Sequence, residues 1–281
     1  MQLRKATRKK AKIRLGLSAV SGGGKTYSAI LIAKGLCGGD LSKVAVIDTE
    51  NNSADLYAHL GDYNVLPLAP PFSPENYIKA VKTCEAAGME VIIIDSITHE
   101  WDGKGGCLEI MDSLGGKYQD WAKVTPRHNA FIEALLASSC HIITTVRRKQ
   151  DYEMTKGNDG KVKVEKAGLK EITREGFEYE LTVNLQLDQN HNALPSKDRT
   201  NLFAGRPSFV PSEETGAMIL EWCESGIEAV DPISDAVMKL ASCDTVEELK
   251  LLKEILPEEV VKSPNFQAAA KLRFAEVNKA A

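Results

Sequence analysis

The chain has 281 residues, 43% of them hydrophobic and 26% charged, and its formal net charge is -4. This composition is typical of a soluble globular protein with a sizeable core, and the slightly acidic balance excludes nucleic-acid binding through bulk positive charge. No apolar run approaches the about 20 residues that a membrane helix needs, and the basic N-terminal segment lacks the apolar stretch of a signal peptide, so no membrane contact is expected.

Apolar periodicity predicts that strands and helices alternate through the first half of the chain. Strands are expected at Lys12–Val20, Lys43–Asp48, Val91–Asp95 and His141–Val146. Helices are expected in the segment TYSAILIAKGL, which follows the first strand, and at Glu75–Ala87 and Thr125–Ser139. This alternation favours an α/β fold whose mostly parallel sheet is covered on both faces, and such sheets bind ligands at the carboxyl ends of their strands.

The character of the sequence changes after Arg147. The polar segment Arg148–Lys170 contains the turn signal Asn158-Asp159-Gly160 and predicts an exposed hairpin. Strict alternation at Phe177–Asp188 predicts an antiparallel strand, and a helix is expected at Glu213–Cys223.

A separate helical module is predicted from Ala229 onward, after which Asp231-Pro232 interrupts the chain. Three short helices are expected in it, at Ser234–Ala241, Val246–Leu256 and Asn265–Lys279. The predicted domains are therefore residues 1–228 and residues 229–281.

The segment between the first strand and the first helix matches the P-loop pattern, with Ala19 in place of the usual first glycine. Glycines let consecutive backbone N–H groups wrap around phosphate oxygens, and the helix that follows directs its positive end at the anion. Lys25 supplies a positive charge at the β- and γ-phosphates, and the Thr26 hydroxyl can ligate Mg²⁺. The residues expected to bind ATP here are Ala19, Ser21, Gly22, Gly23, Gly24, Lys25, Thr26 and Tyr27.

Phosphoryl transfer to water also needs a carboxylate that holds the metal and a group that orients the water. Asp95 ends the apolar strand VIIID and is the expected metal partner, together with Thr26. Glu50 follows the strand that ends at Asp48, and it is the expected catalytic carboxylate. Glu100 is the competing candidate, because Ser96 stands where many P-loop ATPases carry a glutamate directly after the metal aspartate.

The P-loop, the segment IDTENNSADLYA and the segment IIIDSITHEWDGKGG, together with WAKVTPRHN and KDRTNLF, resemble the phage-encoded RecA/RadA-like ATPases of the AAA family. The resemblance covers about Leu3 to Trp222. It implies a RecA-like P-loop NTPase core with a mostly parallel central sheet and an antiparallel extension, followed here by the small helical module. It also implies that the catalytic Glu follows the second strand and that Ser follows the metal Asp, as at Glu50 and Ser96.

The same resemblance implies two further parts of the ATP site. The strand after the Asp95 strand ends in a polar sensor of the γ-phosphate in this family, a place that Thr144, Thr145 and Arg147 occupy here. A Lys-x-Arg motif of related ATPases reaches the γ-phosphate of the neighbouring subunit, so Lys197 and Arg199 are the expected finger residues. Alternatively, Thr144 and Thr145 only fill a buried strand, where β-branched residues are favoured. Lys197 and Arg199 could likewise be only a solvated charge cluster on a loop.

Three features are candidates for contact with single-stranded DNA. The first is the N-terminal basic segment, which ends at Arg14 and could equally be a solvated edge or a subunit-docking arm. The second is the loop from Trp101 to Gly106, in which the indole could stack on a base or pack in the core. The third is the lysine-rich hairpin Arg148–Lys170, where charged hairpins are often only solvated.

The leading hypothesis is an ATP- and Mg²⁺-dependent recombination ATPase that binds single-stranded DNA as a homo-oligomer, with its active site between subunits and a possible recombination or single-strand-binding protein as partner. A nucleotide-switched loader or regulator with little turnover is the first alternative, and a metabolic P-loop kinase is the second. The six cysteines form no CxxC pair and predict reduced thiols in the cytoplasm, that of the bacterial host if the protein is phage-encoded.

Overall fold

The computed structural model describes residues 5–156, 162–227 and 232–280, with the backbone path alone given for 152–156, 162–167 and 279–280. The chain divides into two compact units, one of residues 11–225 and one of residues 1–10 with 226–281. Within the described residues, no helix combines the length and the apolar character needed to cross a membrane.

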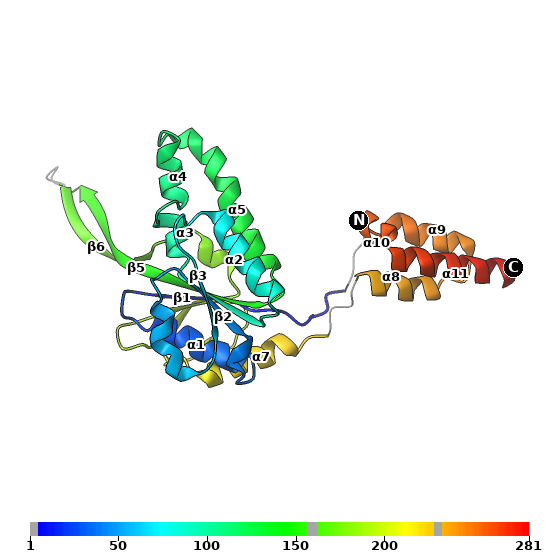
Figure 1. The fold of residues 1–281 in the computed structure, drawn as a ribbon, viewed down its shortest axis with the longest axis horizontal. Coiled ribbons are helices and arrows are strands. Elements are labelled where there is room, and N and C mark those ends of the chain that lie inside the picture. The colour runs from blue at the N-terminus through cyan, green and yellow to red at the C-terminus, as the bar shows by residue number, and fades with distance from the viewer. Residues whose placement is uncertain (1–4, 157–161, 228–231, 281) are drawn as a thin grey trace. The chain divides into compact units, whose positions relative to one another are not determined.

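The larger unit is built on one sheet in the order β3-β2-β4-β5-β1-β7-β8, with β6 paired to an extension of β5 (Figure 1). Neighbours from β3 to β7 run parallel, whereas β7–β8 and β5–β6 are antiparallel. The strands are β1 (Arg14–Ala19), β2 (Val44–Asp48), β3 (Asn64–Pro67), β4 (Val91–Asp95), β5 (His141–Lys156), β6 (Val162–Glu171), β7 (Val183–Leu187) and β8 (Ala193–Asp198). The predicted mostly parallel sheet with an antiparallel extension is confirmed.

Helices cover both faces of this sheet, as alternate strand residues require. The side chains of Leu15, Val46 and Ile93 point to one face, where they pack with α1 (Lys25–Leu36) and α7 (Glu213–Glu224). Their neighbours along the strands, such as Ile47, Ile92 and Ile142, point to the other face, where α2 (Pro74–Ala86) and α5 (Trp121–Ala137) cover them. Figure 1 shows α1 and α7 on one side of the sheet and α2 and α5 on the other. The β-branched strands are therefore buried on both faces, as parallel strands commonly are.

Short helices connect these elements at the carboxyl ends of the strands. A 3₁₀ helix, η2 (Ser53–Leu60), follows β2, and the pair α3 (Thr98–Asp102) and α4 (Cys107–Ser113) follows β4. The remaining pieces of the larger unit are η1 (Leu41–Lys43), η3 (Tyr118–Asp120) and α6 (Phe177–Glu180). The sequence patterns did not indicate these short elements, because one or two turns are too few for a helical period to be read.

Two predicted elements differ from those observed. The predicted strand Phe177–Asp188 begins as the helical turn α6, and β7 starts only at Val183. Phe177 and Leu181 are both buried and four residues apart, a spacing that also suits one face of a helix. The predicted separate strand and hairpin after His141 share one continuous strand, β5, which leaves the sheet and pairs with β6. The predicted Asn158-Asp159-Gly160 turn lies outside the described residues.

Glycines allow α1 and α7 to cross at very short range, which fixes the helix that carries the P-loop. A Cβ atom at Gly216 would lie 2.0 Å from the Ile32 carbonyl oxygen, and one at Gly35 would lie 2.0 Å from the Glu213 carbonyl oxygen. Both contacts are with backbone atoms, which cannot swing aside as a flexible side chain can. The two helix backbones therefore pack against one another at these positions.

Gly216→Ala is expected to lower the free energy of unfolding by about 1–3 kcal/mol, because the added methyl forces the helices apart. In an open helix the same change stabilises, by about 0.5–1 kcal/mol, so the expected effect has the opposite sign. Urea unfolding of the variant measures it, with the exposed Glu214→Ala on the same helix as control. Unchanged or increased stability of Gly216→Ala would contradict the close crossing.

The smaller unit contains a helical module with its own core. Its helices are α8 (Pro232–Ala241), α9 (Val246–Ile255), α10 (Glu258–Lys262) and α11 (Pro264–Ala280). Leu240, Leu249, Leu252 and Phe266 are buried together, and a capping box of Thr245 with Glu248 begins α9. The helix α10 was not expected, since Pro257 and Pro264 enclose it closely.

Candidate nucleotide-binding site

The P-loop joins β1 to α1 in a conformation that its glycines permit. Gly22 and Gly24 have φ values of 77° and 79°, in the left-handed region where a side chain is strained. A Cβ at Gly24 would also lie 2.6 Å from Nδ1 of His191, so this ring packs against the loop. The helix α1 begins directly at Lys25, which places its unpaired N–H groups and its positive end at the loop.

A hollow of about 440 Å³ opens over the P-loop. Its walls come from the P-loop and α1, from the segment after β2, from β5 and from the loop beside β8. The lining residues are Ser21, Gly22, Gly24, Lys25, Thr26, Tyr27, Ser28, Glu50, Ser53, Tyr57, Arg147, His191, Val210 and Pro211. The structure thus gathers most of the predicted ATP-binding residues and Glu50 at one place, whereas Ala19 and Gly23 are buried behind the loop.

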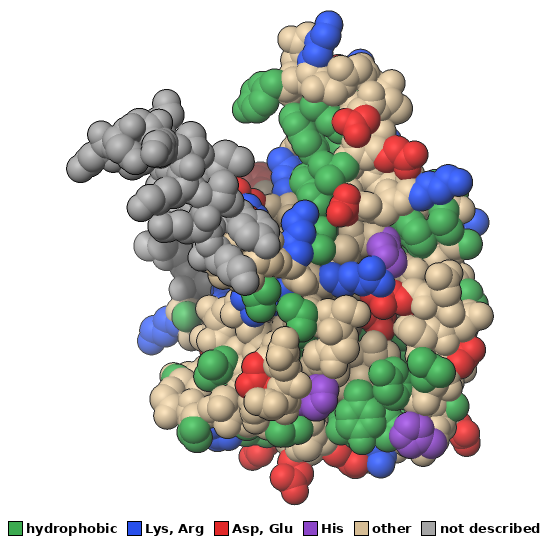
Figure 2. Space-filling view, turned by 90° about the vertical axis from the view of Figure 1, so that its left-hand side faces the viewer, with side chains coloured by type: hydrophobic (Ala, Val, Ile, Leu, Met, Phe, Trp, Pro, Cys, Tyr) green, Lys and Arg blue, Asp and Glu red, His purple; other side chains and the backbone are tan. Residues whose placement is uncertain are grey.

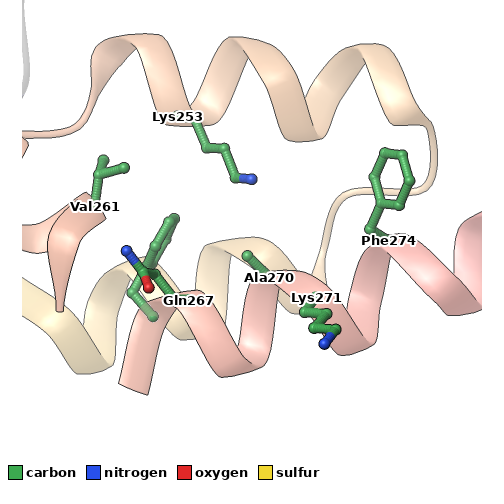
Figure 3. A pocket seen from close by; sticks show the side chains of 7 residues that line it. Lys253, Val261, Gln267, Ala270, Lys271 and Phe274 are labelled. Carbon is green, nitrogen blue, oxygen red and sulfur yellow. The ribbon is translucent and has the colours of Figure 1, made fainter. Parts of the chain in front are cut away.

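A second hollow, of about 550 Å³, lies in the helical module (Figure 3). Lys253 extends into it from α9, and Phe274 borders it on α11. Its lining contains no carboxylate and no glycine-rich loop. It therefore lacks the parts that bind phosphate and metal, and the candidate site is the hollow over the P-loop.

Asp95 connects the P-loop to the centre of the sheet. The hydroxyls of Thr26 and Thr145 each donate a hydrogen bond to its carboxylate, at 2.5 Å to Oδ2 and Oδ1 respectively. The side chain is almost fully buried, and burial raises the pKa of Asp95, against the lowering effect of the two hydroxyls. Thr26 and Asp95 thus present hard oxygen atoms close together beside the phosphate-binding loop, the type of ligand that Mg²⁺ prefers.

The loop after β2 is fixed by Asp48, and this places Glu50 over the hollow. The Asp48 carboxylate accepts hydrogen bonds from the Glu50 N–H at 2.6 Å and from the Ala54 N–H at 2.9 Å. The Glu50 side chain forms an ion pair with Arg147, with 2.8 Å between Oε1 and Nε. Burial alone raises the pKa of Glu50, but the hydrogen bond and charge of Arg147 outweigh it, so that the pKa is lowered and the carboxylate stays ionised.

Lys25 lies at the base of the same hollow and is 8% exposed. Its ammonium group contacts the carbonyl oxygens of Ala19 at 3.5 Å and Val20 at 3.3 Å, the carbonyls of the loop itself. Burial lowers the pKa of Lys25, while the charges of Asp95 and Glu50 oppose that effect. A buried cation with such long contacts is well placed to bind phosphate.

A family model described as an AAA domain matches residues 11–210 of this chain, most of its length. The chain belongs to that family. It is a nucleotide-binding ATPase of the P-loop type, and members of the family generally use ATP and Mg²⁺. No curated protein matches the sequence.

The remaining predicted site residues of this AAA ATPase lie outside the hollow. Thr145 is fully buried, and its hydroxyl contacts Asp95. Lys197 donates to the carbonyl oxygens of Glu178 and Tyr179, and Arg199 donates to that of Tyr179 at 3.2 Å. In its own chain the Lys-x-Arg motif therefore contacts α6 and not the P-loop.

The competing carboxylate, Glu100, is enclosed in a separate buried cluster. It accepts hydrogen bonds from the Cys107 thiol at 3.1 Å and lies 3.1 Å from Nδ1 of His128. Trp101 packs beside this cluster, with its ring stacked on Trp121 at a centroid distance of 5.5 Å. Glu100 does not line the nucleotide hollow. The Trp101 ring packs against buried residues of the fold, as in the core-packing alternative.

The three candidate DNA-binding features differ in how much of them is available. Arg14, in the basic N-terminal segment, is buried and donates hydrogen bonds to the carbonyls of Leu136, Ser138 and Cys140, so its charge is used inside the fold. On the face drawn in Figure 2, the described Lys and Arg side chains are mixed with Asp and Glu and form no large area of one sign. Most lysines of the predicted hairpin lie among the residues whose side chains are not described.

Sequence reasoning did not single out Tyr57 and His191, which also line the hollow. Tyr57 makes an edge contact with Tyr27 at a centroid distance of 5.9 Å. Its place in the segment SADLYA, which begins three residues after Glu50, was an available signal. His191 belongs to the turn between β7 and β8, and no spacing in the sequence relates that turn to the P-loop.

Proposed function

We propose that this AAA ATPase is a RecA-like recombination ATPase that hydrolyses ATP with Mg²⁺ and binds single-stranded DNA as a homo-oligomer. The observation that carries the proposal is the convergence of Lys25, Thr26 and Glu50 on one hollow, with Asp95 directly behind Thr26. A phosphate cradle, a metal-holding carboxylate and a second carboxylate for water are the parts that ATP hydrolysis needs.

Each of these residues has a defined part in the reaction. The P-loop N–H groups and Lys25 hold the phosphates. Thr26 and Asp95 would hold Mg²⁺, which would offset the negative charge on the phosphate oxygens. Glu50 orients a water molecule and accepts its proton as the water oxygen bonds to the γ-phosphorus. The bond from the γ-phosphorus to the bridging oxygen breaks, and ADP leaves with that electron pair.

Binding to DNA is supported by a pair of like charges on the β5–β6 hairpin. Lys149 and Lys170 are both exposed, and their Cα atoms are partners in the antiparallel register. Like charges directly opposite one another destabilise a sheet unless an anion lies between them. A DNA phosphate supplies such an anion. Lysine contacts to phosphates carry no information about the base sequence, so this pair favours binding that is independent of the DNA sequence.

Assembly is supported by the position of the Lys-x-Arg motif. Arg199 is exposed, Lys197 is half-buried, and neither lines the hollow of its own chain. Asp198 between them accepts hydrogen bonds from the N–H groups of Thr200 and Phe203 and so fixes the turn. A fixed pair of cations that lies away from the P-loop of its own chain, with Arg199 exposed, suits insertion into the site of a neighbouring subunit.

One observation favours the nucleotide-switch alternative, in which ATP binds but turns over little. Glu50 is engaged by Arg147 and is not free to orient water. If that ion pair also persists with ATP bound, the protein is a switch that reports nucleotide state.

ATP hydrolysis is expected to rise when single-stranded DNA is added and to rise more than linearly with protein concentration. The rate of phosphate release, measured over a range of protein concentrations with and without an oligonucleotide, tests both parts. The double variant Lys149→Ala/Lys170→Ala is expected to keep the DNA-free rate and to lose most of the stimulation, because only the hairpin charges are removed. Lys25→Ala is the control that removes nucleotide-dependent turnover.

A rate per protein molecule that changes with neither DNA nor protein concentration would refute the recombination ATPase. Tight ATP binding with negligible turnover would then identify the nucleotide switch. Retention of full DNA stimulation in the double-lysine variant would exclude the Lys149–Lys170 pair as the contact.

A further inference from the structure

Glu100, Cys107 and His128 form a buried cluster outside the nucleotide hollow. They lie on three different helices, α3, α4 and α5, and the residues are 1%, 0% and 4% exposed, respectively. The Cys107 Sγ and the His128 Nδ1 each lie 3.1 Å from Oε1 of Glu100. In the part of the chain that the structure describes, no other three His, Cys, Asp or Glu residues bring one ligand atom each within 4.8 Å of one another. The fold therefore gathers a thiol, an imidazole and a carboxylate at one point.

The charges of these three groups suit a divalent cation. A thiolate and a carboxylate together carry two negative charges, and a neutral imidazole adds a nitrogen ligand without adding charge. A divalent ion would make the cluster neutral, which matters where water is excluded. Burial and the negative charge of Glu100 raise the pKa of the Cys107 thiol, so the thiol keeps its proton until a bound metal displaces it.

The mixture of ligand atoms and their spacing favour zinc. Sulfur and nitrogen ligands suit Zn²⁺, whereas Mg²⁺ prefers an octahedron of oxygen atoms. A tetrahedral zinc ion holds such ligand atoms about 3.3–3.6 Å apart, given Zn–S and Zn–N bonds of about 2.3 and 2.0–2.1 Å. The two separations of 3.1 Å from Oε1 of Glu100 are slightly shorter than this. Small rotations of the three side chains are therefore enough to admit the ion.

Aromatic rings pack around the imidazole, and a hollow gives access to it. The ring of His128 makes edge contacts with Trp101 and Phe131, at centroid distances of 5.7 and 6.4 Å. His128 also lines a hollow of about 310 Å³, together with Arg174 and Phe177. The hollow provides a route for an ion and for the water molecule that would complete four-coordination beside three protein ligands.

We propose that Glu100, Cys107 and His128 bind a structural zinc ion that joins α3, α4 and α5. The S–H bond of Cys107 breaks as the Zn–S bond forms, and the proton leaves to solvent. His128 presents the lone pair of Nδ1 and keeps its ring proton on Nε2. Because α3 follows β4 closely, the ion stabilises the segment after Asp95. This site lies apart from the nucleotide hollow, so it goes beyond the proposed ATP hydrolysis and does not depend on it.

Cobalt substitution tests the site directly, because a Co²⁺ ion bound to a thiolate gives a charge-transfer band in the near ultraviolet. Nucleotide-free protein, reduced and stripped of metal with a chelator, is titrated with Co²⁺. The band is expected to saturate at one equivalent and to disappear when Zn²⁺ is added, since such ligands bind Zn²⁺ more tightly. A Co²⁺ ion at Thr26 gives no such band, because no cysteine is among the described residues that line the nucleotide hollow.

Variants of the three ligands are compared with a matched cysteine. Cys107→Ser is expected to lose the band, and Glu100→Gln and His128→Gln are expected to weaken Co²⁺ binding at least roughly 100-fold. Cys140→Ser is the control that keeps the band, because Cys140 is also buried and precedes His141 but belongs to no such cluster. Zn²⁺ at about 100-fold excess over its Kd is expected to raise the Tm by roughly 5–10 °C in the wild type and in Cys140→Ser, but not in Cys107→Ser.

Absence of the band in the wild type would refute the zinc site, whatever the variants do. A band that persists in Cys107→Ser would place the ion on other cysteines and would refute it as well. Thermal unfolding in EDTA shows whether each variant folds like the metal-free wild type. If Cys107→Ser does not fold, Glu100→Gln decides, since it keeps the size of the side chain and an acceptor for the thiol. Unchanged Co²⁺ affinity in that variant would exclude the carboxylate and with it the proposed site.

Discussion

Glu50→Gln is expected to lower the rate of ATP hydrolysis by about 10²- to 10⁴-fold, the usual contribution of a general base. The amide keeps the size of the side chain but cannot accept the proton of the attacking water. Phosphate release at saturating ATP measures the loss. Nucleotide binding by the variant is retained, because Lys25, Thr26 and the P-loop are untouched.

Glu90→Gln provides the matched control for this change. Glu90 forms an exposed ion pair with Lys43 at 2.8 Å and directly precedes β4, so it lies at the end of the sheet opposite Asp95. Its replacement is expected to leave the rate unchanged. A Glu50→Gln variant that hydrolyses ATP within a few-fold of the wild type would show that Glu50 is not the catalytic base. Glu100 could not replace it as the base, because Glu100 is buried and does not line the hollow.

Arg199→Ala is expected to lower ATP hydrolysis by about 10³-fold or more, if Arg199 completes the site of a neighbouring subunit. Mixing this variant with Glu50→Gln is then expected to restore activity, although each is inactive alone. In an equal mixture, about a quarter of the interfaces of a head-to-tail assembly combine an intact Glu50 with an intact Arg199. The rate of the mixture, compared with the mean of the separate variants, measures the restoration.

The alternative is a structural role, because Lys197 and Arg199 donate hydrogen bonds to carbonyl oxygens of α6 in their own chain. If these side chains only stabilise α6 within one chain, Arg199→Ala loses stability and mixing restores nothing. Thermal unfolding of Arg199→Ala, measured beside the mixing experiment, therefore separates a structural role from a role at the interface. A stable Arg199→Ala variant with full activity by itself would exclude both.

The positions of the nucleotide-site residues follow from the order of the strands. Because β5 lies between β1 and β4, the hydroxyl of Thr145 is beside Asp95, and Arg147, two residues further on, is beside Glu50. Alternate residues of a strand share a face, so Thr145 and Arg147 are placed on the same side of β5 by the period of two. The buried Thr145 donates a hydrogen bond to the Asp95 carboxylate, and the partly exposed Arg147 lines the hollow.

Local chemistry in the sequence was sufficient to predict the α/β fold, the P-loop and the place of Asp95 at the end of a buried strand. Apolar β-branched runs such as Val91–Ile94 predict parallel strands that are buried on both faces, and a strand, a glycine-rich turn and a helix in succession predict a phosphate site. These features depend on neighbours within about ten residues of each other, which is the range over which periodicity and turn chemistry act. The helical module was predicted for the same reason.

Only the tertiary structure decided which distant side chains meet. The pairing of Glu50 with Arg147 joins residues 97 positions apart, and the packing of His191 on Gly24 depends on how the β7–β8 turn returns to the P-loop. Arg14, one residue of the basic segment that was a candidate for DNA contact, is likewise buried among the carbonyls at the end of α5. Such contacts are set by strand order and helix packing, to which the identity of each residue contributes only together with the rest of the chain.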